Sequence, residues 1–148
     1  MKLKFFECKV KYEKVMENGL QKHVTEAYLV DALSYTEAES RFLEEIRPFM
    51  SGEFEVDSIT RVKIHDIFFN EKESADKWYK CKLSFSGAEK RSNTFFFVQA
   101  SDLREAIKYL DEQMKGTISD YEIIAVTETL IMDVYPYEDD LQEATMNQ

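Results

Sequence analysis

An internal duplication is the feature that most constrains how this chain can fold. Three blocks recur in the same order: Phe5–Tyr12 matches Trp78–Phe85, Val30–Glu44 matches Val98–Glu112, and Phe54–Phe68 matches Tyr121–Tyr135. Of the 38 aligned positions, 11 are identical, and 11 of the other 27 exchange one apolar side chain for another. A unit repeated in this way is typically too small to bury its own hydrophobic face. The sequence therefore predicts one structure built from two similar parts.

The length and composition suit a single packed domain. The chain has 148 residues, of which 44% are hydrophobic, which is ample for a core. We expect one globular domain over residues 1–137, with repeat 1 at about 1–69 and repeat 2 at about 78–137. The remaining residues, 138–148, are acidic and predict a flexible tail.

Charge and hydropathy exclude some classes of partner. The formal net charge of −10 repels polyanions at long range, which disfavours nucleic acid and anionic membranes. The longest apolar runs, such as Phe95–Val98 and Ile123–Val126, are far shorter than a membrane span, and the first residues lack a signal-peptide pattern. We expect a cytoplasmic protein without a membrane partner.

Each repeat has the pattern of two strands, a helix and a further strand. In repeat 1, Phe5–Val15 alternates apolar and polar residues, an Asn-Gly turn follows, and Val24–Leu33 returns as a second strand. Ser34 and Glu37 form a helix capping box, and Asp102 and Glu105 take the matching places in repeat 2. The predicted fold class is therefore α+β: two ββαβ units related by a pseudo-twofold, with mainly antiparallel sheets and one helix per repeat.

The last strand of each repeat is predicted to be long, over Phe54–Phe69 and Tyr121–Tyr135. Strict alternation would place Tyr121, Ile123, Ala125 and Ile131 on one face of the second strand, and Ile124, Val126, Leu130, Met132 and Val134 on the other. Both faces are then apolar, although one layer of helices covers only one of them. The other repeat or another subunit is expected to cover the second face, and this favours a homodimer.

Few residues suggest chemistry. The sequence has two histidines, His23 and His65, and lacks the common nucleotide, metal or nucleophile motifs, so no cofactor is expected. The two cysteines, Cys8 and Cys81, take matching positions between apolar neighbours and are expected to be core residues. The remaining candidates for chemistry are acidic residues that recur at matching positions of the two repeats.

Asp66 and Asp133 interrupt the last strand at the same place in both repeats. They could bind backbone N–H groups near a turn, or they could converge on a divalent metal. The first interpretation is a structural role and the second a catalytic one.

The most suggestive group of residues belongs to the hairpin of repeat 2. Trp78, Lys80 and Lys82 alternate on one strand, and Asn93, Phe95 and Phe97 alternate on the next, with Lys90 and Arg91 at the turn. Aromatic rings among cations form a surface of the kind that stacks single-stranded nucleic acid. The same aromatic residues can equally be core or interface, and repeat 1 has Ala27 and Leu29 in place of Phe95 and Phe97.

Several short segments of repeat 2 resemble an uncharacterised bacterial and phage family that is classed as a domain of unknown function. They are Phe97–Ala100, Met114–Thr117, Asp120–Ile123, and Glu128–Tyr135 with one position free. The resemblance covers most of the chain and is strongest from Trp78 to Tyr137. It implies a small bacterial or phage-derived protein and brings no catalytic residues with it.

These observations favour a non-enzymatic binding or assembly module. It would present the aromatic sheet face to a protein partner or to a second copy of the chain. The first alternative is single-stranded nucleic-acid binding through Trp78, Lys80, Lys82, Phe95 and Phe97. The second alternative is a metal-dependent enzyme that uses Asp66 and Asp133.

Overall fold

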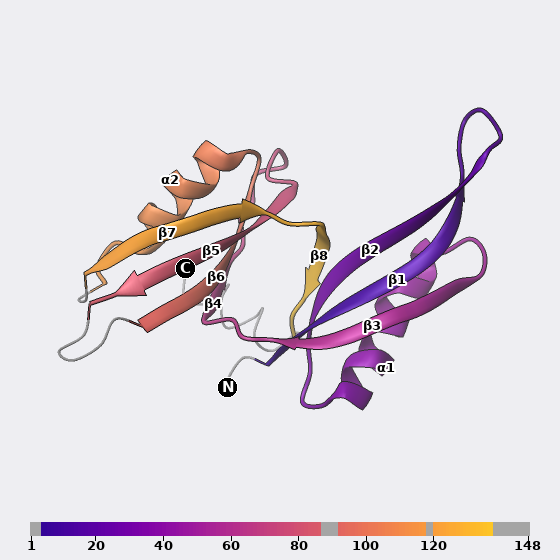
Figure 1. Ribbon diagram of the computed structural model, residues 1–148, viewed down its shortest axis with the longest axis horizontal. Helices are drawn as coiled ribbons and strands as arrows, with labels where there is room; N and C mark the ends of the chain where they lie inside the picture. The colour runs from indigo at the N-terminus through magenta and orange to yellow at the C-terminus, as the bar shows by residue number, and fades with distance from the viewer. Residues whose placement is uncertain (1–3, 87–91, 118–119, 138–148) are drawn as a thin grey trace. The chain divides into compact units, whose positions relative to one another are not determined.

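The chain folds into two compact units. The computed structural model describes residues 4–86, 92–117 and 120–137, so Lys90, Arg91 and the acidic segment 138–148 lie outside the described residues. Unit 1 comprises Met1–Val62 together with Ile131–Gln148, and unit 2 comprises Lys63–Leu130. Each unit is an α+β structure with one four-stranded mixed sheet and one helix (Figure 1).

Unit 1 contains the first hairpin, the first helix and the last strand of the chain. Its elements are β1 (Phe5–Val15), β2 (Gln21–Asp31), α1 (Tyr35–Ile46), the 3₁₀ turn η1 (Arg47–Phe49), β3 (Phe54–Val62) and β8 (Ile131–Tyr135). The strand order is β3-β1-β2-β8, and β8 is parallel to β2 whereas the other pairs are antiparallel. Gly19 has a φ of +83°, which supports the predicted Asn-Gly turn between β1 and β2.

Unit 2 repeats this arrangement with the second half of the sequence. Its elements are β4 (Asp66–Phe68), β5 (Lys77–Phe85), β6 (Ser92–Ala100), α2 (Leu103–Gln113) and β7 (Tyr121–Glu128). The strand order is β4-β6-β5-β7, with β4 parallel to β6. The predicted duplication of one unit is thus confirmed at the level of the two sheets and their helices.

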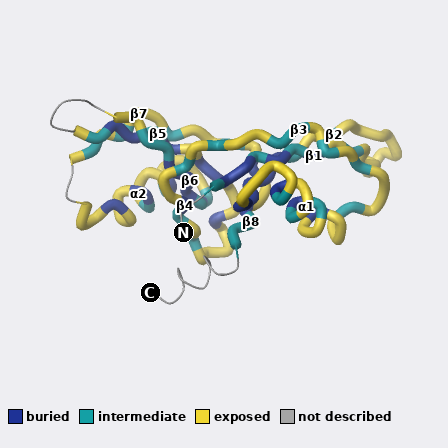
Figure 2. Tube along the Cα trace, turned by 90° about the horizontal axis from the view of Figure 1, so that it is seen from below, coloured by how far each residue is buried: buried dark blue, intermediate teal, exposed yellow. Residues whose placement is uncertain are grey.

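Each unit has its own core between its helix and its sheet (Figure 2). Cys8 lies in the core of unit 1 and Cys81 in that of unit 2, as predicted. In unit 1, Phe6, Cys8 and Val10 of β1 pack against Phe42 and Ile46 of α1. In unit 2, the matching β5 residues are Tyr79, Cys81 and Leu83, and they pack against Leu110 of α2 and Met114 just beyond it. The alternation of β1 and β5 therefore places one row of side chains under the helix.

The predicted helix caps are confirmed in both units. Ser34 Oγ accepts a hydrogen bond from Glu37 N at 3.1 Å, and Glu37 Oε1 accepts one from Leu33 N at 3.2 Å. In unit 2, Asp102 Oδ1 accepts from Glu105 N at 2.8 Å. Each N-cap side chain thus satisfies a backbone N–H group that the helix itself leaves unpaired. The Glu105 carboxylate differs from that of Glu37, because it accepts hydrogen bonds from Ser101 Oγ at 2.6 Å and Asn70 Nδ2 at 3.1 Å.

The predicted long last strand of each repeat is wrong. The segment 54–69 is broken into β3 and β4, and the segment 121–135 into β7 and β8. After each break the chain crosses to the other unit: β4 follows β3 but pairs with β6, and β8 follows β7 but pairs with β2. The two repeats therefore exchange their last strands, and the boundaries of the units fall inside the sequence repeats.

The two exchanged strands dock in the same register. Asp133, Val134 and Tyr135 pair with Tyr28, Leu29 and Val30 of β2, and the matching residues Asp66, Ile67 and Phe68 pair with Phe96, Phe97 and Val98 of β6. Asp66 Oδ1 accepts from Ile67 N, and Asp133 Oδ1 accepts from Val134 N, each at 2.8 Å. The two carboxylates thus bind backbone N–H groups at the start of each exchanged strand.

Each helix also binds the far end of the strand that its sheet receives. Arg41 of α1 donates to the carbonyl oxygens of Tyr135 at 3.5 Å and Pro136 at 3.3 Å, and also to Asp31 O. The matching position on α2 is Tyr109, whose hydroxyl donates to Phe69 O. A guanidinium and a phenol therefore serve the same purpose in the two copies.

The strand after the helix in each unit contains a β-bulge, so the strict alternation predicted for β3 and β7 is wrong. The pairing between β1 and β3 skips Asp57, and the pairing between β5 and β7 skips its counterpart Ile124. An extra residue shifts the following side chains to the opposite face. Val126 consequently packs against the unit 2 core with Ile123, whereas Ile124 is 47% exposed.

In the part of the chain that the structure describes, none of the helices is both long and apolar enough to cross a bilayer.

The strand exchange predicts which unit loses stability when β8 is weakened. Ile131 and Val134 are 5% and 4% exposed, so replacing both by alanine should remove about 4 kcal/mol of stability. Because β8 belongs to the sheet of unit 1, amide hydrogen exchange should accelerate in β2 more than in β6. Ile124→Ala, in the exposed bulge of β7, is the control and should change exchange little. Faster exchange confined to β5 and β6 would contradict the exchange of strands.

The buried thiols predict a dependence on alkaline pH. Burial raises the pKa of both Cys8 and Cys81 from 9.0 to about 12. The protonated thiols therefore contribute to stability below about pH 9, and this contribution is lost as the pH rises toward 12. Neither thiol of the folded protein should react with Ellman's reagent at about pH 8, whereas both should react in concentrated urea. Rapid reaction of the folded protein would show that a thiol is accessible.

Candidate functional site

The six predicted site residues lie on the face of the unit 2 sheet that α2 does not cover, but they differ in exposure. Lys80 and Asn93 are exposed, and Lys82 and Phe95 are half-buried. Trp78 and Phe97 are only 2% and 3% exposed. Of the three aromatic rings proposed to form one surface, only that of Phe95 meets solvent.

The two buried rings are held by contacts within unit 2. The ring of Phe69 lies edge-on to Trp78, with 5.4 Å between centroids. The Trp78 carbonyl accepts hydrogen bonds from Thr129 N at 2.9 Å and Thr129 Oγ1 at 2.8 Å, which fixes the chain where it leaves β7. Phe97 pairs with Ile67 of the exchanged strand β4. Trp78 and Phe97 are thus interior residues that support the exchange of strands.

Lys80 and Phe95 form the centre of the exposed part. The ammonium of Lys80 lies over the Phe95 ring, 4.6 Å from its centroid. The two residues are diagonal neighbours, because Lys80 pairs with Phe97 and Lys82 pairs with Phe95. The contact holds the cation against an apolar surface and covers one side of the ring.

The bulge in β7 adds apolar residues that the sequence pattern did not place here. Lys82 pairs with Ala125, and Leu83 pairs with Ile123, so the skipped residue Ile124 lies beside Lys82 at the sheet edge. Ile124 and Ala125 are both exposed. The only sequence signal for this position is its match to Asp57, a polar residue. We use the term exposed sheet face for Lys80, Lys82, Asn93, Phe95, Ile124 and Ala125.

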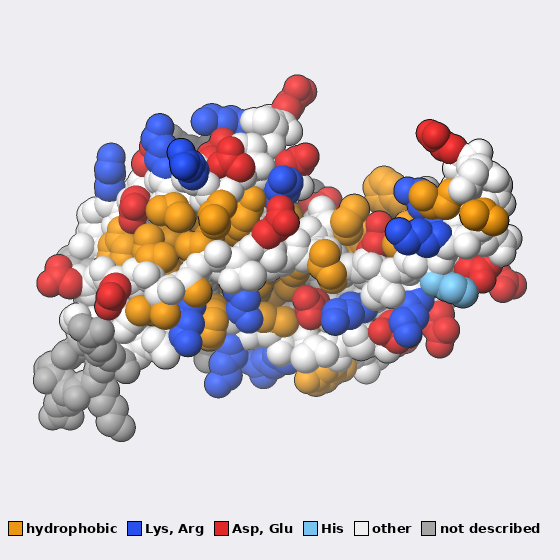
Figure 3. Space-filling view, turned by 45° about the horizontal axis from the view of Figure 1, so that its top comes forward, with side chains coloured by type: hydrophobic (Ala, Val, Ile, Leu, Met, Phe, Trp, Pro, Cys, Tyr) orange, Lys and Arg blue, Asp and Glu red, His pale blue; other side chains and the backbone are white. Residues whose placement is uncertain are grey.

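The matching surface of unit 1 is chemically different, although it is built on the same scaffold. Its residues, in the same order, are Glu7, Lys9, Thr25, Ala27, Asp57 and Ser58. Asp57 Oδ1 forms an ion pair with Lys11 Nζ at 3.1 Å, which balances the charge of the carboxylate. The exposed sheet face of unit 2 thus gains a lysine, a phenylalanine and an isoleucine where unit 1 has a glutamate, an alanine and an aspartate. Figure 3 shows hydrophobic side chains at the surface over unit 2, with lysine and arginine side chains beside them.

The other candidate residues have structural environments. His23 lies 3.6 Å from Glu13 in an exposed ion pair, and the ring of His65 packs on Phe96 at 5.0 Å. Within residues 4–86, 92–117 and 120–137, there is no group of three or more histidine, cysteine, aspartate or glutamate side chains that could hold a metal ion. Asp66 and Asp133 each bind the backbone of their own strand, as described above.

Comparison with known proteins places the chain in a family. No curated protein matches the sequence. A family model covers residues 4–137, which is nearly the whole of both units. The chain belongs to the family described as Domain of unknown function (DUF4494).

Proposed function

We propose that the protein is a non-enzymatic binding module that contacts a protein partner through the exposed sheet face of unit 2. The observation that carries this proposal is the difference between the two matched faces. Both faces are built on equivalent strands that pair in equivalent register, so the fold does not require Phe95, Ile124 and Lys80 in place of Ala27, Asp57 and Glu7. An exposed isoleucine beside an aromatic ring and two lysines is a typical composition for a contact surface.

The charge of this face indicates the chemistry of the partner. Lys80 and Lys82 carry two positive charges on a chain whose net charge is −10. The complementary surface would present carboxylates around an apolar side chain that packs on Phe95 and Ile124. A symmetric homodimer through this face would bring these lysines toward their copies, which is unfavourable. We therefore favour a different protein whose contact surface is acidic, and self-association would have to use another arrangement.

Nucleic acid is a poorer fit to the same face. Stacking platforms present several open rings, but Trp78 and Phe97 are buried and Lys80 covers one side of Phe95. Two lysines also provide few phosphate contacts, so counterion release contributes little. The acidic remainder of the chain opposes approach of a polyanion.

The first test is a titration with single strands. Labelled dT and rU oligomers at low salt should show no binding tighter than about micromolar, because the stacking and phosphate contacts are too few. Fluorescence anisotropy measures this directly, and an unrelated single-strand-binding protein serves as the positive control. Saturable binding that weakens steeply with salt and is lost in Phe95→Ala would instead support the nucleic-acid function.

The second test uses the matched faces as target and control. A photo-crosslinking amino acid is placed at position 124 in one variant and at position 57 in another, and both are expressed in cells that naturally produce the protein. We expect a discrete protein adduct from position 124 and none from position 57. Lys80→Glu with Lys82→Glu should reduce the adduct by about tenfold or more, because both favourable charges are reversed.

The identity of the adduct decides between the remaining outcomes. A different protein, crosslinked through a surface that carries carboxylates around an apolar side chain, supports the proposal. An adduct with a second copy of the chain would show assembly by self-association and contradict the acidic partner. Equal adducts from both positions, or none from position 124, would contradict the use of this face.

A further inference from the structure

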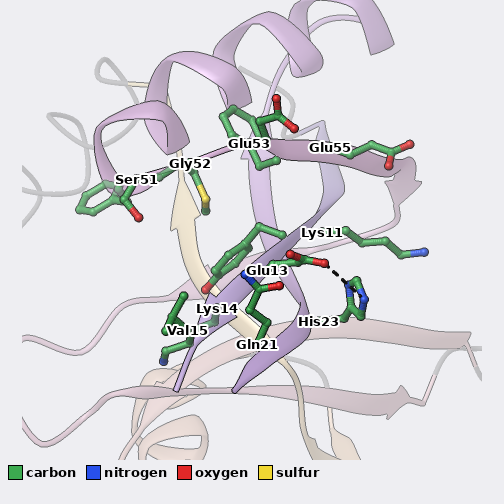
Figure 4. A pocket seen from close by; sticks show the side chains of 14 residues that line it. Lys11, Glu13, Lys14, Val15, Gln21, His23, Ser51, Gly52, Glu53 and Glu55 are labelled. Atoms are coloured by element: carbon green, nitrogen blue, oxygen red, sulfur yellow. Dashed lines mark ion pairs between the residues drawn. The ribbon is translucent and has the colours of Figure 1, made fainter. Parts of the chain in front are cut away.

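A cleft in unit 1 has no role in the proposed function. It lies between the end of the β1–β2 hairpin and the segment from Phe49 to Glu55, and its volume is about 880 Å³. Figure 4 shows Glu53 and Glu55 on one side, with the hairpin residues Lys14, Val15 and Gln21 facing them across the opening. All of its lining residues belong to unit 1.

One wall of this cleft is an unpaired strand edge. The pairing of β1 with β3 ends at Tyr12 opposite Phe54. β1 continues for three more residues, Glu13 to Val15, which pair with β2 on their other side. In the part of the chain that the structure describes, no strand pairs with the free side of these three residues. Their outward backbone groups are therefore available to another extended chain.

Unit 2 shows what occupies the matching place. There the chain before β7 stays beside β5, and Ser86 N donates to Asp120 O at 3.1 Å. The matching residues in unit 1 are Glu13 and Glu53, and no backbone bond joins these two described residues. The segment before β3 turns away toward η1 instead. The backbone bond that Ser86 makes to Asp120 in unit 2 thus has no equivalent at Glu13 in unit 1.

The two sides of the cleft differ in character. Phe54 packs on the helix-side core together with Met50, and Tyr12 continues the core-facing row of β1. Phe49, which is 75% exposed, adds an apolar ring to the lining of the cleft. Glu53 and Glu55 alternate with Phe54 and therefore lie on the opposite side, where both are exposed. A strand in the cleft would meet Tyr12, Phe54 and the aliphatic stem of Lys14 on one face and the carboxylates of Glu53 and Glu55 on the other.

The charges on this second side are unevenly balanced. Glu13 Oε1 lies 3.6 Å from His23 Nε2, and the ammonium of Lys11 forms an ion pair with Asp57 at 3.1 Å. Among the described residues, Glu53 and Glu55 have no ion-pair partner. A positively charged side chain directed toward them would be favoured by charge complementarity.

We infer that this cleft binds a short extended peptide of a partner protein by adding it as a strand to the free edge of β1 at Glu13–Val15. The peptide would alternate apolar side chains, directed toward Tyr12 and Phe49, with basic side chains, directed toward Glu53 and Glu55. The site is separate from the exposed sheet face of unit 2, so the failure of either proposal leaves the other unaffected.

The test uses the full-length protein and a fluorescein-labelled six-residue peptide in which lysine alternates with valine and phenylalanine. Three control peptides share its length: one has the same residues in blocks, one has glutamate in place of lysine, and one is N-methylated at alternate amides. Strand pairing requires those amides, so N-methylation should weaken binding about tenfold. The block and glutamate peptides should also bind at least about tenfold more weakly, because they lose the alternation or the charge match.

Protein variants locate the site. Glu53→Lys with Glu55→Lys should weaken binding of the lysine peptide by about tenfold or more. Glu44→Lys with Glu45→Lys makes the same change of charge on exposed residues of α1 and should leave binding unchanged. On the unaltered protein, peptide binding should slow hydrogen exchange of the Glu13 and Val15 amides, a readout that does not depend on how any variant folds.

Several results would overturn the inference. Equal binding of the N-methylated peptide would exclude strand pairing, and equal binding of the block peptide would reduce the interaction to charge alone. Protection of Glu13 and Val15 that increases with protein concentration in the absence of peptide would show that a second copy occupies the edge.

Discussion

The exchange of the last strand between the two repeats is the constraint on which the rest of the structure depends. Without β8, strand β2 would be an edge strand that presents the buried side chains of Ala27 and Leu29. The same holds for β6 and Phe97 without β4. Each sheet is completed by a strand from the end of the other repeat, so unit 1 combines Met1–Val62 with Ile131–Gln148, whereas unit 2 is the continuous segment Lys63–Leu130. Arg41 and Tyr109 bind carbonyl groups at the ends of the two incoming strands and so hold each strand in the sheet that receives it.

The sequence predicted the elements of each repeat better than their connections. The core positions of Cys8 and Cys81 and the caps at Ser34 and Asp102 follow from local patterns, and they are confirmed. The crossings are not marked in this way, because the short segments Lys63–His65 and Thr129–Leu130 contain neither glycine nor proline. A run of apolar residues predicts a strand, but it does not indicate which of the two sheets that strand joins. The bulges at Asp57 and Ile124 also have no signal in the sequence. Each inserts one extra residue, which reverses the alternation from which the face of each following side chain is predicted.

The candidate site was predictable in part for the same reason. Alternation alone predicts that Lys80, Lys82 and Phe95 lie on one face of the hairpin, and the observed register of β5 and β6 confirms this. The burial of Trp78 and Phe97 depends on tertiary contacts of the kind that Phe69 and the exchanged strand β4 make. These contacts come from segments that are distant in the sequence, so no local pattern predicts them. Residue types therefore identified the face, whereas the set of exposed residues on it required the fold.

Duplication gives this chain an internal reference that single domains lack. Where both copies keep a feature, as with the capping residues and the bulge, the scaffold accounts for it. Where they differ at an exposed position, the scaffold does not, because the other copy builds the same sheet without it. Ile124 is the clearest case: at 47% exposure it buries only part of its side chain, and its counterpart Asp57 supports the same bulge while forming an ion pair with Lys11. The open edge that begins at Glu13 is the converse case, since the matching residue Ser86 binds Asp120 of its own unit and Glu13 has no such bond to Glu53. The two differences lie on different units, so each copy has acquired a surface that the common fold leaves unexplained.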